Sequence, residues 1–556
     1  MRCEKYSFKK VSASGRNFSE KPSESWISAR LNLQSLSGTV ISVGYYAVAS
    51  FFRCLGAFLS AEERKAAVRD CRNLPQSRLA KSVVFCFVPG YATLAHKESV
   101  LLYLLNLNSG MAYEIIAGRS QKDKDRYGLK GAIFIGKNYV KFGKDVSLAN
   151  QVYLDAASPH IILVAGKRGS GKSYTLSVIA EGLLDLPKDV SNNISTLIFD
   201  TLGIFWTMKY PNYRDDLLLK EWGLAPKNYS PIIYVPFGLF KKYQEKGIPV
   251  DIPFALKPNE VSAESWAEIF NLELVSGEGT LLERVVDAAN TTLGDYEIDD
   301  LIELAVSDHR SNDTERNVIE NRLLAAKKWG IFGKNGTNIS QLFKGGTNTI
   351  IDLSAYSEQE GGHRIKALVI GLLSKKILQH RMLARKSEEI NLISSGGFLL
   401  GKETATTGEE APMIWIMIDE AHEFLPQENQ PKTLATDPLM QLLREGRQPG
   451  ISVVMATQQP GKIHTDVMTQ SDIVISHRVT ARIDIESLNL IASTYLPKAI
   501  QVYIDSLPAT KGSAILLDDK QERIYPIQVR PKLSWHGGGD PTAVKDELKV
   551  LKLNRY

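Results

Sequence analysis

The stretch HIILVAGKRGSGKSYTLSVIAEGLLDL, residues 160–186, decides the fold. Residues 160–165 are apolar and rich in β-branched types, which is typical of a buried strand, and a glycine ends the run. Residues 173–186 have the apolar spacing of a helix, and a second apolar run over 196–199 ends in Asp200. A strand, a helix and a second strand at this spacing predict a βαβ unit. They therefore predict an α/β fold on a parallel sheet that is covered on both faces.

The loop between that strand and helix, residues 166–173, matches the pattern G-x-x-x-x-G-K-S completely. Its glycines let backbone N–H groups turn toward phosphate oxygens, and the helix N-terminus adds partial positive charge there. The motif predicts ATP with Mg²⁺, with Lys172 on the β- and γ-phosphates and Ser173 on the metal ion. A glycine-rich turn that binds nothing is the alternative, which the matching context disfavours. The predicted nucleotide-binding residues are Gly166, Lys167, Arg168, Gly169, Ser170, Gly171, Lys172, Ser173 and Tyr174.

A second motif, MIWIMIDEAH over residues 413–422, ends an unbroken apolar run with two acids. Ligands bind at the carboxyl ends of strands in open α/β sheets, so both acids are expected beside the phosphates. We expect Asp419 to hold Mg²⁺ with Ser173, and Glu420 to orient and deprotonate the attacking water. An acidic pair here favours hydrolysis over phosphoryl transfer to a metabolite. The alternative is two solvated acids at a strand end.

A third motif is LLREGRQPG over residues 442–450, followed by a predicted strand and by Gln458. Arg444 and Arg447 are three apart and share one helical face. In ring motors an arginine from the neighbouring subunit stabilises charge on the γ-phosphate, and we assign this catalytic role to Arg444 and Arg447. The alternative is a surface salt bridge with Glu445 or a charge at the helix end. Gln458 is the candidate sensor of the γ-phosphate or the water, and Asp200 either reaches the metal shell or caps a turn.

The composition is that of an ordinary soluble protein. The chain has 556 residues, 44% hydrophobic and 23% charged, with a formal net charge of +5. A single core stops growing beyond roughly 250–300 residues, so about two or three domains are expected. The mild basic balance does not by itself argue for nucleic acid, although a basic channel can hide within a near-neutral total.

Cysteine usage and hydropathy limit the possible cellular location of the protein. The four cysteines form no C-x-x-C pair and have no histidine pair nearby at metal-ligand spacing, which disfavours a zinc site and a disulfide framework. They fit a reducing cytosol, so a cytoplasmic location is predicted. Residues 31–52 are uncharged and long enough to cross a bilayer, but polar and glycine residues dilute them. A pair of soluble strands or a buried helix is the preferred interpretation, and a membrane is not expected as a partner.

Taken in order, these motifs resemble one family. They are GKRGSGKS (166–173), DTLGIFW (200–206), IDEAHEFLP (418–426), REGRQPGISVVMATQQP (444–460), QSDIVISHRV (470–479) and VRPKLSWHGG (529–538). The combination resembles the HerA branch of the HerA–FtsK superfamily over roughly residues 142–540. The first and third motifs are common to many P-loop proteins, whereas the ordered set is specific. The resemblance implies a homo-hexameric DNA-translocating ATPase with a RecA-like P-loop NTPase core, an N-terminal HAS β-barrel, a helical insertion and a C-terminal brace onto the adjacent subunit.

Applied to this chain, the resemblance implies an order of domains. It assigns Arg530 and His536 to the brace, and it leaves residues 1–80 unexplained, because the barrel normally begins near the start of the chain. The predicted divisions are an N-terminal extension of unknown role (1–80), a HAS-like β-barrel (81–148), a first segment of the RecA-like core (149–254), a helical insertion (255–345), a second segment of the core (346–518) and the brace (519–556).

The expected function is therefore an ATP-driven hexameric translocase or helicase on double-stranded DNA, with Lys432 as a candidate contact to DNA. The chain has no PD-(D/E)xK pattern and no second glycine-rich dinucleotide motif. A partner nuclease or NAD-consuming effector would then supply any cutting or signalling, in DNA end processing or anti-phage defence. Two alternatives remain open, a membrane-associated secretion or conjugation ATPase and an ATP-binding scaffold for a defence effector.

Overall fold

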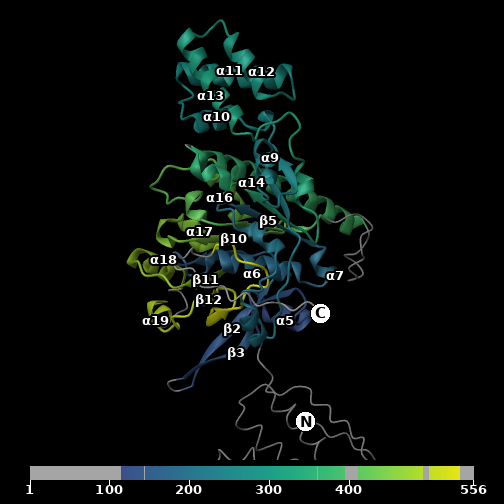
Figure 1. Cartoon of the computed structure of the whole chain (residues 1–556), viewed down its shortest axis with the longest axis vertical. Helices are drawn as coiled ribbons and strands as arrows, with labels where there is room; N and C mark the ends of the chain where they lie inside the picture. The colour runs from purple at the N-terminus through teal and green to yellow at the C-terminus, as the bar shows by residue number, and fades with distance from the viewer. Residues whose placement is uncertain (1–113, 143–144, 360, 395–410, 493–499, 539–556) are drawn as a thin grey trace, which may run out of the picture. The chain divides into compact units, whose positions relative to one another are not determined.

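A computed structural model of the chain describes residues 114–142, 145–359, 361–394, 411–492 and 500–538 (Figure 1). The predicted extension 1–80, the apolar segment 31–52 and most of the predicted barrel 81–148 lie outside the described residues.

The described residues build one 13-stranded sheet in the order β1-β3-β2-β13-β12-β11-β4-β10-β9-β5-β8-β6-β7. From β11 to β7 every neighbouring pair is parallel, as the βαβ pattern predicts. These strands are β11 (Ile473–His477), β4 (Ile161–Ala165), β10 (Ile451–Thr457), β9 (Met413–Ile418), β5 (Ile194–Asp200), β8 (Asn348–Asp352), β6 (Ile232–Pro236) and β7 (Ile252–Phe254).

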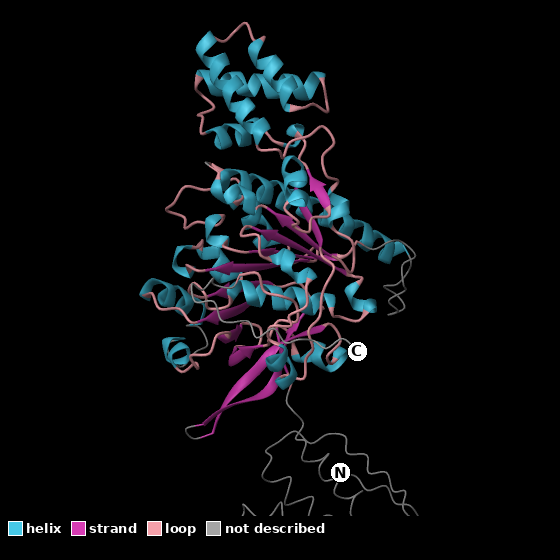
Figure 2. Cartoon of the chain, viewed as in Figure 1, coloured by secondary structure: helices cyan, strands magenta, loops and turns pink. Residues whose placement is uncertain are grey.

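Helices cover both faces of these strands (Figure 2). Alternate residues of β4 enter two separate cores, because successive side chains of a strand point to opposite faces. Ile162 and Val164 pack in the core that includes α6 (Lys172–Leu184), and Leu163 packs in the core that includes α14 (Gly362–Ser394) and α16 (Thr436–Glu445). This burial on both sides explains the continuous apolar runs in the sequence.

The other half of the sheet is antiparallel. β12 (Ser513–Asp518) pairs with β11, and β13 (Arg523–Val529) joins β12 to the hairpin of β2 (Ala132–Phe142) and β3 (Asp145–Asp155). β1 (Ile115–Ala117) lies parallel to β3 at the edge. The described residues of the predicted barrel thus continue the main sheet, and the boundary predicted at residue 148 falls inside β3.

Four helices form the segment predicted as a helical insertion, and Figure 1 shows them grouped together. They are α10 (Ala263–Phe270), α11 (Gly277–Thr292), α12 (Ile298–Val306) and α13 (Asp313–Lys328). Ser262, Ser276 and Asn312 cap α10, α11 and α13 by accepting backbone N–H groups. Trp266 of α10 packs against Phe332 with ring centroids 4.8 Å apart, which ties the insertion to the segment returning to the core.

Shorter helices connect the strands. They are α5 (Gln121–Tyr127), α7 (Lys188–Ser191), α8 (Asp216–Glu221), α9 (Phe237–Glu245), α17 (Thr465–Gln470), α18 (Arg482–Ala492) and α19 (Ile500–Asp505). The longest of the described helices, α14, has 33 residues and ends at Ser394.

A buried charged network stands just before β4. The imidazole of His160 contacts Asp155 (Nε2–Oδ2, 3.1 Å) and Asp472 (Nδ1–Oδ2, 2.7 Å), and Arg119 Nε donates to Asp155 (2.9 Å). Burial alone would lower the pKa of His160, but hydrogen bonds to the two carboxylates outweigh it and raise the pKa above 6.5. Ser158 Oγ also lies 3.1 Å from Nε2, which resembles a serine–histidine–aspartate triad. Both ring nitrogens face carboxylates and Ser158 Oγ donates to Asp155, so no nitrogen is free to accept the serine proton and this cluster is structural.

This network makes stability depend on pH. The raised folded-state pKa of His160 means that its contribution is complete below about pH 6.5 and is lost as pH rises through that pKa. We expect Asp472→Asn to destabilise the fold by about 1–3 kcal/mol near pH 5–6 and by less near pH 9. Thermal unfolding across this range measures the effect, with Asp519→Asn, an exposed acid nearby, as the control. An equal loss at every pH contradicts this account.

Candidate active site

The phosphate loop lies between the carboxyl end of β4 and the first turn of α6. Gly169 (φ 72°) and Gly171 (φ 115°) adopt left-handed backbone conformations that favour glycine. Lys172 is 6% exposed, and its Nζ donates to the carbonyl of Lys167 at 3.3 Å. Burial lowers the pKa of Lys172, while the charges of the nearby acids oppose that shift. Lys167 and Arg168 are exposed to solvent.

The loop and the acidic strand meet through one hydrogen bond, in which Ser173 Oγ donates to Asp419 Oδ2 at 2.6 Å. Asp419 is fully buried at the end of β9. Burial raises its pKa to about 6, and the charge of Glu420 acts in the same direction. A hydroxyl and a buried carboxylate side by side are oxygen ligands of the kind that Mg²⁺ prefers, and a cation here would offset the cost of keeping Asp419 charged. The residues present therefore fit the expected metal ion.

Glu420 has the geometry of a residue held ready for water. Its backbone is left-handed (φ 51°), which is unusual for a residue with a side chain, and its N–H donates to Asp419 Oδ1 at 2.9 Å. Gln458 Nε2 donates to Glu420 Oε1. Glu420 Oε2 lies 3.5 Å from Nδ1 of the His422 imidazole, and it is buried and makes no hydrogen bond among the described residues. Such an atom calls for an explanation, and a water to be activated supplies one.

The contacts of two further residues, His422 and Asp200, indicate their roles. His422 Nδ1 lies 3.3 Å from Thr457 Oγ1, and burial lowers its pKa, so a neutral hydrogen-bonding role fits. Asp200 accepts backbone N–H groups from four successive residues, 202–205, at 2.7–3.3 Å. Burial and the charge of Asp352 raise the pKa of Asp200 to about 7. Of the two roles predicted for Asp200, the turn cap is the one that the contacts favour.

Both candidate arginines are exposed and lie away from the phosphate loop of their own chain. α16 ends beside the amino end of β10, whereas Gln458 and the loop lie at its carboxyl end. A seven-residue strand spans roughly 20 Å at about 3.3 Å per residue. Arg444 pairs with Asp466 of α17 (Nε–Oδ2, 3.0 Å), not with Glu445 as the alternative predicted. Neighbours in a helix diverge by about 100°, so Arg444 and Glu445 do not face each other.

Tyr174, predicted to bind nucleotide, directs its side chain to the C-terminal segment, defined here as residues 530–538. Its hydroxyl accepts the N–H of Lys532 at 2.5 Å. Its ring meets that of His536 edge to face, with centroids 5.2 Å apart. Only the backbone of Tyr174, in the first turn of α6, faces the same way as the loop amides.

The C-terminal segment contacts α6 of its own chain. Arg530 and His536, which the resemblance assigns to a brace on the adjacent subunit, both contact this helix, and the brace itself stays a prediction. Arg530 Nη1 binds Glu181 Oε2 at 2.9 Å, and both side chains are buried. Glu181 is therefore an important residue that sequence reasoning missed. The available signal was a lone acid within the apolar helix face SVIAEGLL.

Similarity to known proteins agrees with this geometry. Residues 140–376 match the family model described as helicase HerA, central domain. This part of the chain is therefore similar to the central domain of HerA, a P-loop ATPase. Residues 345–527 also match the model of zonular occludens toxin (Zot). A relative from Pyrococcus furiosus, DNA double-strand break repair helicase HerA, is 22% identical over 426 residues, which cover 72% of this chain and 71% of the relative.

Solved structures of similar proteins include VirB4 of Thermoanaerobacter pseudethanolicus, with a TM-score of 0.44 and 12% identity over 72% of this chain and 96% of that one. Another is the bacterial conjugative coupling protein TrwB, with a TM-score of 0.37 and 13% identity over 74% of this chain and 97% of that one. With its parallel sheet, its phosphate loop and its match to the HerA central domain, this HerA-like protein is an α/β P-loop NTPase and an ATPase. None of its described helices is both long and apolar enough to span a bilayer.

The site of this HerA-like ATPase predicts a separation of binding from turnover. Glu420→Gln keeps the size and the contact with Gln458 but cannot take a proton. We expect ATP binding to persist and kcat to fall by about 10²–10⁴-fold. Steady-state ATPase assays and equilibrium ATP binding measure the two effects. Glu428→Gln, an exposed acid in the same segment, is the control. Turnover near the wild-type rate in Glu420→Gln would remove this residue from the mechanism.

Proposed function

We propose that this HerA-like ATPase forms a homo-hexameric ring that translocates double-stranded DNA, with a separate nuclease or NAD-consuming effector as partner. The observation that supports a ring is that the candidate catalytic residues lie at two opposite edges of the sheet. Lys172, Ser173, Asp419 and Glu420 share one edge of the sheet, whereas the arginines lie at the opposite edge. A head-to-tail arrangement, which closes into rings, brings those two edges together.

In this mechanism each residue has a distinct task. Lys172 binds the β- and γ-phosphates, and Ser173 and Asp419 hold Mg²⁺, which when bound offsets phosphate charge. Glu420 Oε2 accepts the proton of the attacking water while Gln458 fixes the other carboxylate oxygen. Arg444 or Arg447 of the next copy then contacts the γ-phosphate, after Arg444 leaves Asp466.

The DNA track is supported by the name of the Pyrococcus relative, a DNA double-strand break repair helicase. Phosphate contacts dominate such binding, so we expect duplex DNA to raise the ATPase rate and the stimulation to fade between about 50 and 200 mM salt. ATPase assays with and without linear duplex measure this. The double variant Lys172→Ala/Glu420→Gln controls for contaminating activity. A stable ring whose rate ignores DNA at low salt would exclude the DNA track and favour the export ATPase or the scaffold.

Sharing of the site between copies has its own test. Arg447→Ala and Glu420→Gln should each bind ATP without turning it over. Mixing them in equal amounts before assembly should restore activity, because about a quarter of head-to-tail interfaces then join an intact Glu420 to an intact Arg447. The control mixes Arg447→Ala with the double variant Glu420→Gln/Arg447→Ala, in which no copy supplies the arginine. Recovery in both mixtures, or in neither, would show that Arg447 does not act across an interface; the Arg444 pair is run in parallel.

A further inference from the structure

Three consecutive side chains of the first turn of α6 point in three directions. Ser173 contacts Asp419 at the end of β9, and Thr175 Oγ1 lies 2.9 Å from Nε2 of His477 at the end of β11. Asp419 and His477 are fully buried, so strands of the sheet close both of these directions. The third side chain, Tyr174, faces the C-terminal segment, where it is half-buried.

The phosphates and the nucleoside of one bound nucleotide cannot occupy the same side of this turn. The site proposed above holds the γ-phosphate toward Asp419 and Glu420. The nucleoside must then leave the loop by a direction that no strand closes. The Tyr174 side qualifies, because His536 is half-buried and Gly537 and Gly538 are exposed there without side chains.

The ring of His536 suits a planar partner. Burial, with the charge of Lys532 acting in the same direction, lowers the pKa of His536 to about 4, so the ring is neutral near pH 7. The edge-to-face contact with Tyr174 occupies one side of the His536 ring. A neutral aromatic ring at a partly exposed position is a surface on which a nucleobase can stack.

Hydrogen bonds and an ion pair with α6 hold the residues that precede His536. The carboxylate of Glu181, 0% exposed, accepts three hydrogen bonds from Leu533 and Ser534 at 2.7–3.1 Å, besides its ion pair with Arg530. A buried carboxylate is costly unless each oxygen is satisfied, and here both are. The segment is therefore fixed relative to the helix that carries the phosphate loop.

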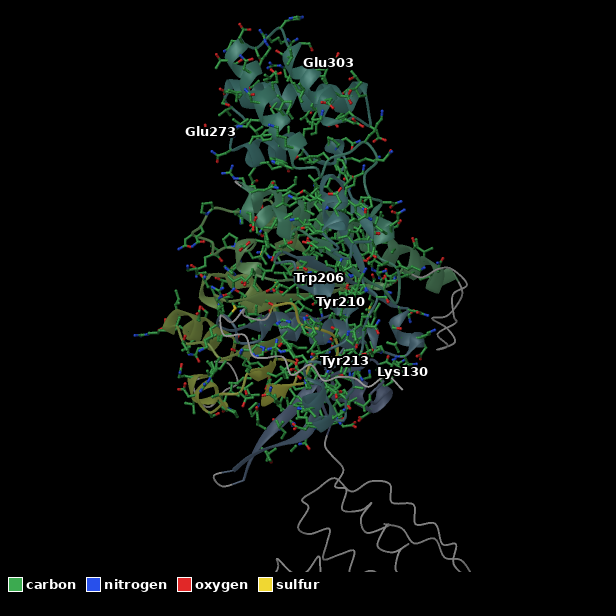
Figure 3. All side chains as sticks on the ribbon, in the orientation of Figure 1. Lys130, Trp206, Tyr210, Tyr213, Glu273 and Glu303 are labelled. Atoms are coloured by element: carbon green, nitrogen blue, oxygen red, sulfur yellow. The ribbon has the colours of Figure 1, made fainter. Side chains whose placement is uncertain are left out.

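The segment that follows β5 holds the other side. The backbone N–H of Trp535 donates to the carbonyl of Tyr210 at 2.7 Å, and Thr207 Oγ1 donates to the carbonyl of Trp535 at 3.0 Å. Trp206 and Tyr210 of the same segment pack edge to face at 6.0 Å (Figure 3). Fixed between two elements, His536 is ordered before a ligand arrives, which reduces the entropy cost of binding.

We propose that His536, supported by Tyr174, is the platform on which the nucleobase of the bound nucleotide stacks. The inference rests on the proposed phosphate site at residues 166–173. It makes the C-terminal segment a part of the nucleotide site of its own chain, and it makes His536 a residue that recognises the base and takes no part in bond cleavage.

The test compares two ligands that share the phosphates and differ in the base, ATP and inorganic tripolyphosphate, each with Mg²⁺. Calorimetry on the full-length chain gives the Kd of each. Loss of one stacking partner corresponds to roughly 10-fold weaker binding. We expect His536→Ala to raise the Kd of ATP by about that factor and to leave the Kd of tripolyphosphate unchanged. His536→Phe, which keeps an aromatic ring, should bind ATP nearly as the wild type does. His309→Ala, an exposed histidine of the insertion, is the matched control.

Each other outcome overturns the proposal in a distinguishable way. Wild-type binding of ATP by His536→Ala overturns the platform alone. An equal loss for both ligands, or a loss in His536→Phe as large as in His536→Ala, means that the residue supports the fold of the segment and not the base. If the wild-type chain binds neither ligand, the phosphate site fails and the platform fails with it.

Discussion

The hydrogen bond between Ser173 and Asp419 is the contact on which the rest of the site depends. It joins the first turn of the helix after the phosphate loop to the end of a strand about 250 residues further along the chain. Parallel pairing of β4, β10 and β9 brings their carboxyl ends to one edge, so loop, acids and Gln458 converge without any long side chain. Asp419 and Glu420 are buried, which keeps them ordered before a ligand arrives.

The same parallel arrangement explains why the two candidate arginines lie far from the phosphate loop of their own chain. A strand that delivers Gln458 to the phosphate edge necessarily carries the residues before it at the other edge. Arg444 and Arg447 precede β10 and therefore lie far from the loop of their own chain. The pairing of Arg444 with Asp466 gives its guanidinium a partner within the chain. In the proposed ring, the topology of the sheet would therefore link catalysis to assembly.

Local patterns in the sequence predict much of this fold and of the candidate site. The buried strand and helix around 166–173 and the strand ending at Asp419 depend on neighbours in sequence, and the structure has them within a residue or two. The Asp466 partner of Arg444 and the Glu181 network depend on residues brought together by the fold. Periodicity contains no information about such distant pairs. The contact of Arg530 with Glu181 is such a pair, because the motif identifies a segment that docks but not the surface that receives it.

The contact between Glu181 and residues 530–534 has a consequence for biosynthesis. The two partners are about 350 residues apart, so Glu181 has no buried cation beside it until residue 530 has left the ribosome. β13, which pairs with β2, arrives at about the same time. The helix that carries the phosphate loop thus reaches its final surroundings only after residue 530 has been made, and a chain interrupted before that residue would expose an unpaired acid on the face meant for the core. Maturation of the ATP site therefore waits for a segment that is synthesised about 350 residues after the helix itself.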